Sequence, residues 1–163
     1  MIRKIPQDTQ YFTFENTNPK GYRTTDCVVR AIANVLSQTW EKTYRDLFEL
    51  GMKYSRPPED DLIVEKYMKM NNAIKLAQPR KRDNTKFAGT EICYLIQEGK
   101  FIDNDGVVLP YDKYLIRIGT GHVSCIISGK IHDTWNCSYD KVGIMWAVPE
   151  KEYEEWNSMR VIK

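Results

Sequence analysis

Residues 24–36 read TTDCVVRAIANVL, and their apolar side chains recur at the three- and four-residue spacing that lines one face of an α-helix. Thr24 or Thr25 is a suitable N-cap, and Asp26 suits the first turn, where an acidic side chain complements the helix dipole. The run therefore predicts a largely buried helix that carries Cys27 in its first turn.

A cysteine in the first turn of a helix has an unusual electrostatic environment. The free backbone N–H groups and the positive end of the helix dipole favour the thiolate, which lowers the thiol pKa and raises its reactivity near neutral pH. Cys27 also precedes the apolar stripe, whereas a cysteine that only fills a core usually lies within one. We interpret Cys27 as a candidate nucleophile, with an inert buried cysteine as the alternative.

Outward from this helix, the chain divides into a helical first half and a strand-rich second half. The lead-in at 11–23 is expected to be irregular, because its asparagine, proline and glycine residues favour turns. Further elements are predicted as a helix from after Thr39 to Gly51, a helix from Pro57 to about Met70, a short strand at 73–78, a short helix from Thr90 through Gln97, strands at 114–118, 122–127, 130–135 and 142–148, and a final helix at about 149–160. The four strands are expected to form an antiparallel meander. This order indicates an α+β fold in one domain spanning 1–163, helical at about 24–100 and strand-rich at about 101–148.

Composition restricts the classes of partner. The 24 basic and 22 acidic residues leave a net charge of +2, which does not suggest a nucleic-acid-binding protein. The one basic cluster, at 80–82, is interpreted as a solvated loop. The apolar runs are too short to span a bilayer, and residues 1–10 lack the apolar core of a signal peptide. We therefore expect a cytoplasmic protein that does not bind membranes.

The four cysteines do not form a metal-binding pattern. No pair has the Cys-x-x-Cys spacing of zinc sites, and a cytosolic chain of this size does not need disulfides. His122 with Cys125, and His132 with Cys137, are the nearest approach to ligand spacing, but no close cysteine pair accompanies them. We expect neither a metal nor another cofactor, and we expect Cys93 to be buried as a small apolar residue.

A candidate general base lies in the second half of the chain. The stretch GTGHVSCII, residues 119–127, places His122 at the first position of a strand, directly after a glycine-rich turn. Its ordinary pKa near 6.5 allows the ring to take a thiol proton or to form an ion pair with a thiolate. A structural histidine is the alternative. Trp135 and Trp146, in the strands that follow, are expected to fill the core or else to cover this histidine.

The hairpin that follows supplies a third polar group. If residues 128–130 form a three-residue turn, antiparallel pairing places Asn136 directly opposite His122, where its amide can orient the imidazole ring. A two-residue turn would move Asn136 to the other face of the sheet and bring Asp133 to the face of His122. We favour Asn136 and keep Asp133 as the alternative.

The order of these residues resembles that of the papain-like cysteine peptidases: a cysteine at the start of a core helix, then a histidine at a strand start, then Asn or Asp on the next strand. The stretches around 18–32 and 122–136 are similar to those of small bacterial and phage proteins of unknown function. The resemblance covers 24–36 and 114–148. It implies a helical lobe whose buried catalytic helix packs on a C-terminal antiparallel sheet, with Cys27, His122 and Asn136 as a catalytic triad acting on a protein or peptide.

The chain also departs from that family. The family has a glutamine six residues before its cysteine, which helps to form the oxyanion hole, whereas this chain has Gly21 there. Asn18 or Thr25 is the candidate replacement, together with the backbone N–H of Cys27. The leading interpretation is a cysteine hydrolase that cleaves peptide or isopeptide bonds. The alternative is a non-catalytic papain-like binding protein, encoded by a phage or mobile element, that acts on a host factor.

Overall fold

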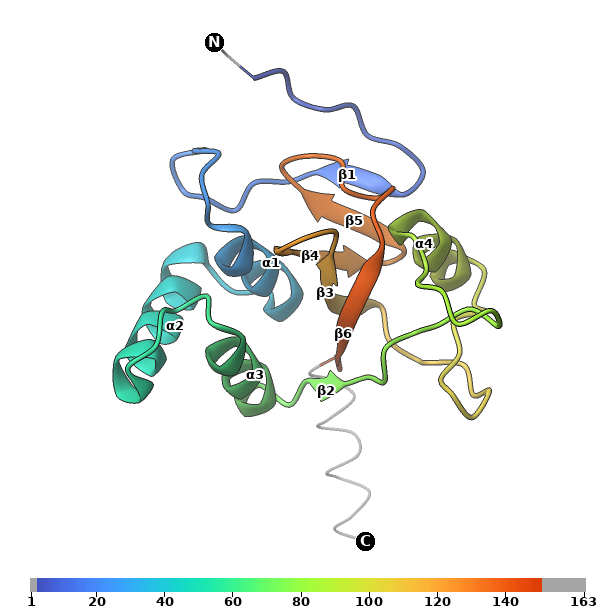
Figure 1. Cartoon of the computed structure of the whole chain (residues 1–163). Helices are drawn as coiled ribbons and strands as arrows, with labels where there is room; N and C mark the ends of the chain where they lie inside the picture. The colour runs from blue at the N-terminus through green and yellow to red at the C-terminus, as the bar shows by residue number, and fades with distance from the viewer. Residues whose placement is uncertain (1–2, 151–163) are drawn as a thin grey trace, which may run out of the picture.

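The computed structural model describes residues 3–150 and has helices on both faces of a six-stranded mixed sheet, an α+β arrangement (Figure 1). The elements in chain order are β1 (Phe12–Phe14), α1 (Cys27–Leu36), α2 (Trp40–Tyr54), α3 (Asp61–Met70), β2 (Ile74–Lys75), α4 (Gly89–Gln97), β3 (Lys113–Ile118), β4 (His122–Ile127), β5 (Lys130–Asp133) and β6 (Val142–Val148). The helix expected at about 149–160 falls, except for its first two residues, outside the described part of the chain.

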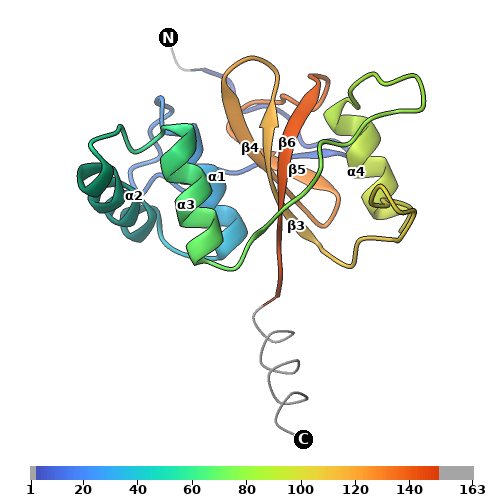
Figure 2. The same ribbon diagram turned by 60° about the horizontal axis from the view of Figure 1, so that its bottom comes forward.

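The sheet separates two apolar cores. Helices α1, α2 and α3 cover one face, and α4 covers the other (Figure 2). Successive side chains of a strand point to opposite faces. Leu115 of β3 accordingly packs with the three helices, whereas its neighbours Tyr114 and Ile116 belong to the core beside α4. Helix α1 packs directly on β4, so the helix that begins with Cys27 lies against the strand that begins with His122.

Helix α1 is confirmed, with Cys27 as its first residue and eight of its ten residues buried. Its N-cap residue is Asp26, so the expectation that Thr24 or Thr25 caps the helix is wrong. The Asp26 carboxylate does not cap the helix either, because it binds side chains instead. It accepts hydrogen bonds from Trp40 Nε1 at 2.9 Å and from Arg30. The start of α1 is thereby tied to the start of α2.

The antiparallel meander expected from the sequence is wrong in two places. The strand order is β1-β5-β4-β3-β6-β2, so β6 pairs with β3 on the far side of the β3–β4 hairpin and not with β5. The free edge of β5 is occupied by β1, which runs parallel to it. The lead-in expected to be irregular therefore contributes a strand, and its Phe12 is fully buried. Three residues are too few to give a periodic signal.

The β4–β5 hairpin has a two-residue turn, Ser128-Gly129, in place of the three-residue turn expected. Ile127 pairs with Lys130, and both turn residues have positive φ, 49° and 75°, as a type I′ turn requires. Gly129 lies against α4, where Gln97 Nε2 donates to its carbonyl oxygen at 2.9 Å. The shorter turn shifts the pairing by one residue. The side chains after the turn that share a face of the sheet with His122 are therefore those expected on the opposite face.

Smaller differences concern where the helices end. Helix α2 begins after the N-cap Thr39, as expected, but it continues past Gly51 to Tyr54. A side chain at position 51 would come within 2.6 Å of the Arg56 carbonyl oxygen, so this glycine allows a close backbone approach and does not end the helix. Within residues 3–150, no helix combines the length and the apolar character needed to cross a bilayer.

Candidate functional site

An open cleft of about 720 Å³ lies where the start of α1 meets the start of β4. Cys27, His122 and Trp135 line it, together with Thr25 and Thr134. The two residues predicted as nucleophile and base are therefore brought to one cleft, although they lie 95 positions apart in the sequence. Both side chains are partly buried, so each is held by the protein and still accessible from the cleft.

The Cys27 thiol contacts the imidazole of His122 and the backbone N–H of Val123. Burial alone would raise the pKa of Cys27. The hydrogen bonds from His122 and Val123, with the positive charges of His122 and Arg30, outweigh burial and lower that pKa below its ordinary value. The position of Cys27 at the N-terminus of α1 acts in the same direction. The thiolate is therefore more accessible at neutral pH than it is for an ordinary cysteine.

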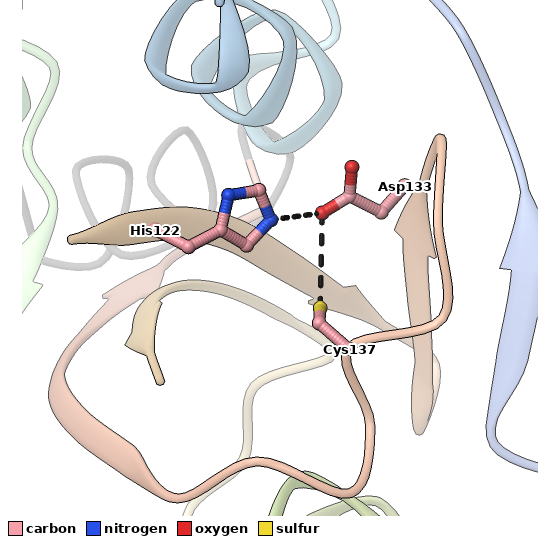
Figure 3. Close-up of side chains that lie close together, drawn as sticks. All are labelled: His122, Asp133 and Cys137. Carbon is pink, nitrogen blue, oxygen red and sulfur yellow. Dashed lines mark hydrogen bonds and ion pairs between the residues drawn. The ribbon is translucent and has the colours of Figure 1, made fainter. Parts of the chain in front are cut away.

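His122 is held by a carboxylate. Its Nε2 lies 2.7 Å from Asp133 Oδ2 (Figure 3). Ser124 Oγ donates to the same oxygen at 2.7 Å. Burial lowers the pKa of His122, but hydrogen bonds with Asp133, Cys137 and Cys27 and the charge of Asp133 raise it to about 11. The ring is therefore protonated at neutral pH and donates Nε2–H to Asp133. Each of the side chains of Cys27 and His122 therefore favours the charged form of the other.

Asp133 ends β5 and is almost fully buried, but its two oxygens are well supplied with donors. Oδ1 accepts from the Thr134 backbone N–H at 2.7 Å and from Arg30 Nη2 at 3.4 Å, while Oδ2 receives His122 and Ser124. Burial raises the pKa of Asp133, and the bonds and charge from His122, with the bond from Ser124, lower it overall. Asp133 is thus an ionised, rigid partner for the imidazolium.

Arg30 connects the two halves of the site. It lies one turn after Cys27 and is 5% exposed. One arm, Nη1, pairs with Asp26 and donates to the Thr24 carbonyl oxygen at 3.3 Å, while the other arm, Nη2, reaches Asp133. A single guanidinium therefore links the segment that carries Cys27 to the carboxylate that holds His122. Arginine suits this role because its planar group offers several donors in fixed directions.

Asn136, the residue favoured from the sequence as the partner of His122, does not contact it. Its Oδ1 accepts from the backbone N–H of Ser138 at 3.1 Å and from Ser138 Oγ at 2.6 Å, which stabilises a local turn. The register prediction was wrong because the hairpin turn is one residue shorter than expected. Asp133, the alternative, takes the place beside His122. Gly129, at the second position of a two-residue turn, was the available signal for this register.

The two candidate oxyanion residues have different surroundings. Asn18 is not among the residues that line the cleft, and its amide donates to Asp26 Oδ2 at 3.2 Å while its oxygen accepts from Lys20 and Tyr22. The structure therefore does not support it as an oxyanion donor. Thr25 is exposed and lines the cleft, next to the first backbone N–H groups of α1, which have no partner within the helix.

Trp135 covers one side of the imidazole. Its ring centre lies 4.9 Å from that of His122 with a tilt of 45°, and it remains 44% exposed at the cleft. Trp146, by contrast, is buried in the core beneath the helices. Of the two possibilities considered from the sequence, Trp135 therefore covers the histidine and Trp146 fills the core.

One group of ligand-type side chains converges within the described residues, namely His122, Asp133 and Cys137, with their ligand atoms within 4.8 Å of one another (Figure 3). The Cys137 sulfur donates to Asp133 Oδ2 at 3.8 Å. The 2.7 Å between His122 Nε2 and Asp133 Oδ2 is a hydrogen-bond distance, shorter than two ligands about 2 Å from one zinc ion normally keep. Hydrogen bonding accounts for the arrangement without an ion.

The second histidine–cysteine pair considered from the sequence, His132 and Cys137, does not come together as a ligand pair. His132 Nδ1 pairs with Glu15 at 2.6 Å, in contact with the lead-in and not with Cys137.

Comparison of the chain with protein-family models, with curated proteins and with solved structures found no match.

Proposed function

We propose that this protein is a thiol-dependent acyl hydrolase that uses Cys27 as nucleophile, His122 as acid and base, and Asp133 as the residue that orients His122. The observation that carries the proposal is that Cys27 and His122 line one open cleft, with Asp133 Oδ2 at 2.7 Å from His122 Nε2. The pKa of Cys27 is lowered and that of His122 is raised, which agrees with this geometry. Such matched displacement in an open cleft is typical of catalytic pairs.

The reaction follows from these positions. The Cys27 thiolate attacks the carbonyl carbon of an amide or ester, forming a C–S bond, and the carbonyl oxygen takes the negative charge. Backbone N–H groups at the start of α1 and the Thr25 hydroxyl are the donors nearest to that charge. The carbonyl re-forms as the bond to the leaving group breaks, and His122 protonates the leaving group. Water then attacks the thioester while His122 accepts its proton, and the Cys27 thiolate leaves.

Peptide or isopeptide bonds of a protein remain the proposed substrates. The departing amine must be protonated as it leaves, and a histidine that is charged at neutral pH supplies that proton. The cleft is also lined by both basic and acidic side chains, among them Arg23, Arg117 and Glu59, which suits a polar polypeptide.

The first test is the pH dependence of Cys27 alkylation by iodoacetamide, followed by mass spectrometry of the peptide that contains Cys27. The S–C bond forms as iodide leaves, so the rate follows the thiolate fraction. We expect a midpoint below the ~8.5 of a free cysteine. Cys27→Ser, a nearly isosteric change, must lose the labelled peptide. A midpoint at or above ~8.5 in the intact protein contradicts the proposal.

A second test separates an enzyme from a binding protein that keeps a reactive thiol. p-Nitrophenyl acetate acylates a reactive thiolate and releases p-nitrophenolate, which is followed by absorbance. A hydrolase releases a burst followed by continued turnover, because water resolves the thioester. One equivalent of p-nitrophenolate with a persistent acetyl group on Cys27 would indicate a non-catalytic papain-like binding protein instead.

A further inference from the structure

A second hollow, of about 370 Å³, lies beside the catalytic cleft between the starts of α1, α2 and α3. Its wall is mostly apolar and includes Val28, Trp40, Tyr44, Phe48 and Pro58. Four residues line both the hollow and the cleft, namely Thr24, Thr25, Val28 and Glu59. Since Thr25 and Val28 flank the dipeptide Asp26-Cys27, the hollow begins immediately beside the nucleophile.

The outer wall of this hollow is a ladder of three aromatic rings on α2. Trp40 and Tyr44 stack with ring centres 5.0 Å apart, and Tyr44 and Phe48 follow at 6.1 Å. Positions four apart lie one above the other on a helix, so the ladder is continuous. The Trp40 ring is fixed because its Nε1 donates to Asp26. Tyr44 and Phe48 are each 44% exposed, so a rigid apolar surface faces solvent next to the site.

The charges at the hollow favour an apolar occupant. Asp26 lines it, but its carboxylate already accepts from Arg30, Trp40 and Asn18. Glu59 stands at the boundary with the cleft and is exposed, so it repels an acidic group. No basic side chain is among the residues of 3–150 that line the hollow. An acidic side chain is therefore disfavoured there, whereas an aromatic or large aliphatic side chain covers the exposed rings.

We propose that this hollow is a specificity pocket that takes an aromatic or large aliphatic side chain of the polypeptide whose carbonyl is attacked by Cys27. The proposal rests on the proposed function and adds the substrate class. Continuity with the cleft through the 24–25 segment identifies the occupant as part of the substrate. An extended chain advances ~3.4 Å per residue, so the side chain belongs to a residue next to, or one removed from, the scissile bond.

The test uses two sets of chloromethyl ketones, acetyl-X-alanyl and acetyl-alanyl-X, in which X is Phe, Ala or Glu. Each alkylates Cys27 with loss of chloride, and the second-order rate constant is measured. In one of the two sets, X = Phe is expected to react roughly tenfold or more faster than X = Ala, because an aromatic side chain leaves water. X = Glu is expected to be the slowest.

The matched variants are Tyr44→Ala combined with Phe48→Ala, and Met52→Ala as control. Met52 is 64% exposed one turn further along α2 and does not line the hollow. The double variant is expected to lose the preference for Phe while its rate with iodoacetamide stays unchanged, and the control is expected to keep both. Circular dichroism confirms that α2 is intact; if it is not, Tyr44→Ala alone replaces the double variant.

Two outcomes overturn the pocket while leaving the proposed function intact. One is that iodoacetamide alkylates Cys27 with a midpoint below that of a free cysteine, while the chloromethyl ketones with X = Phe and X = Ala react at equal rates in both sets. The other is a double variant that elutes later than the wild type in size-exclusion chromatography with an unchanged preference, which makes the ladder a contact between copies. If iodoacetamide itself shows an ordinary thiol profile, the proposed function fails, and the pocket fails with it.

Discussion

Cys27 and Cys137 both lie beside His122, yet the pKa of Cys27 is lowered and that of Cys137 is raised. Cys27 lines the open cleft at the start of α1, whereas Cys137 is 2% exposed and donates to the Asp133 carboxylate. Burial is the largest cause of the raised pKa of Cys137, and the negative charge of Asp133 adds to it. Contact with a histidine is therefore not sufficient to make a thiol reactive.

The difference between the two thiols lies in their other neighbours. Cys27 has the Val123 N–H and the Arg30 charge, and both stabilise a thiolate. Cys137 has a carboxylate, which stabilises a thiol. The histidine is the same in both cases, and Asp133 keeps it charged. The site thus has a thiol of lowered pKa on the cleft side of the imidazole ring and a thiol of raised pKa on its buried side.

The largest expected effect is a contrast in accessibility. With Ellman's reagent, the native protein should show one thiol that reacts within seconds to minutes near neutral pH, and denaturant should expose the other three. Cys93 and Cys125 are fully buried, and burial raises the pKa of each. Cys27→Ser should abolish the fast phase, whereas Cys93→Ala should leave it unchanged. A fast phase that survives Cys27→Ser would break the comparison.

Removing the shared histidine is the next largest effect. His122→Ala should raise the pKa of Cys27, because the imidazolium that stabilises the thiolate is lost. Each unit of that rise lowers the thiolate fraction about tenfold at a pH below both values, so alkylation near pH 6 should fall at least roughly tenfold. The pH profile with iodoacetamide measures it. An unmoved profile would mean that Cys27 owes its reactivity to the helix start alone.

Asp133→Asn compared with Asn136→Ala tests which residue orients the base. The neutral amide still accepts from His122 but no longer stabilises its charge, so the pKa of His122 should fall from about 11. The imidazolium is then lost at lower pH, and the pKa of Cys27 rises by less than in His122→Ala. NMR titration of the ring protons measures the pKa of His122. Asn136→Ala should leave it unchanged; the reverse result would restore the residue favoured from the sequence.

The smallest expected effect is that of Arg30→Lys. A lysine keeps the positive charge but has one ammonium group, which cannot reach Asp26, the Thr24 carbonyl and Asp133 together. We expect a slight rise in the pKa of Cys27 and a lower melting temperature. Arg30→Met, which also removes the charge, should raise the Cys27 pKa further. A melting temperature that falls with no change in either pH profile would show a purely structural role.

Local elements were predictable because local physics specifies them. The apolar spacing of 24–36 produced α1, and the helix-start position of Cys27 followed from the same pattern. Strand residues between turn residues located β3, β4 and β6 to within a residue or two. His122 was expected at a strand start and is the first residue of β4. These features depend on neighbours close in the chain.

Pairing was not predictable in the same way. Ser128 adopts φ of 49°, a conformation more usual for asparagine or glycine, so the sequence carries only a weak signal for the two-residue turn. The packing of Gly129 against Gln97 accompanies that turn, and the turn exchanges Asn136 for Asp133. A difference of one residue in the turn changes the face of every side chain after it.

By itself, the sequence determined that this chain is α+β, that Cys27 begins a buried helix and that His122 begins a strand. Only the tertiary structure decided that β1 and β6 take the two flanks of the β3–β4–β5 unit, that Asp133 holds His122, and that Arg30 joins Asp133 to the start of α1. Periodicity and end signals act over a few residues. Strand partners and buried ion pairs are chosen by competition among surfaces far apart in the chain, which no local pattern encodes.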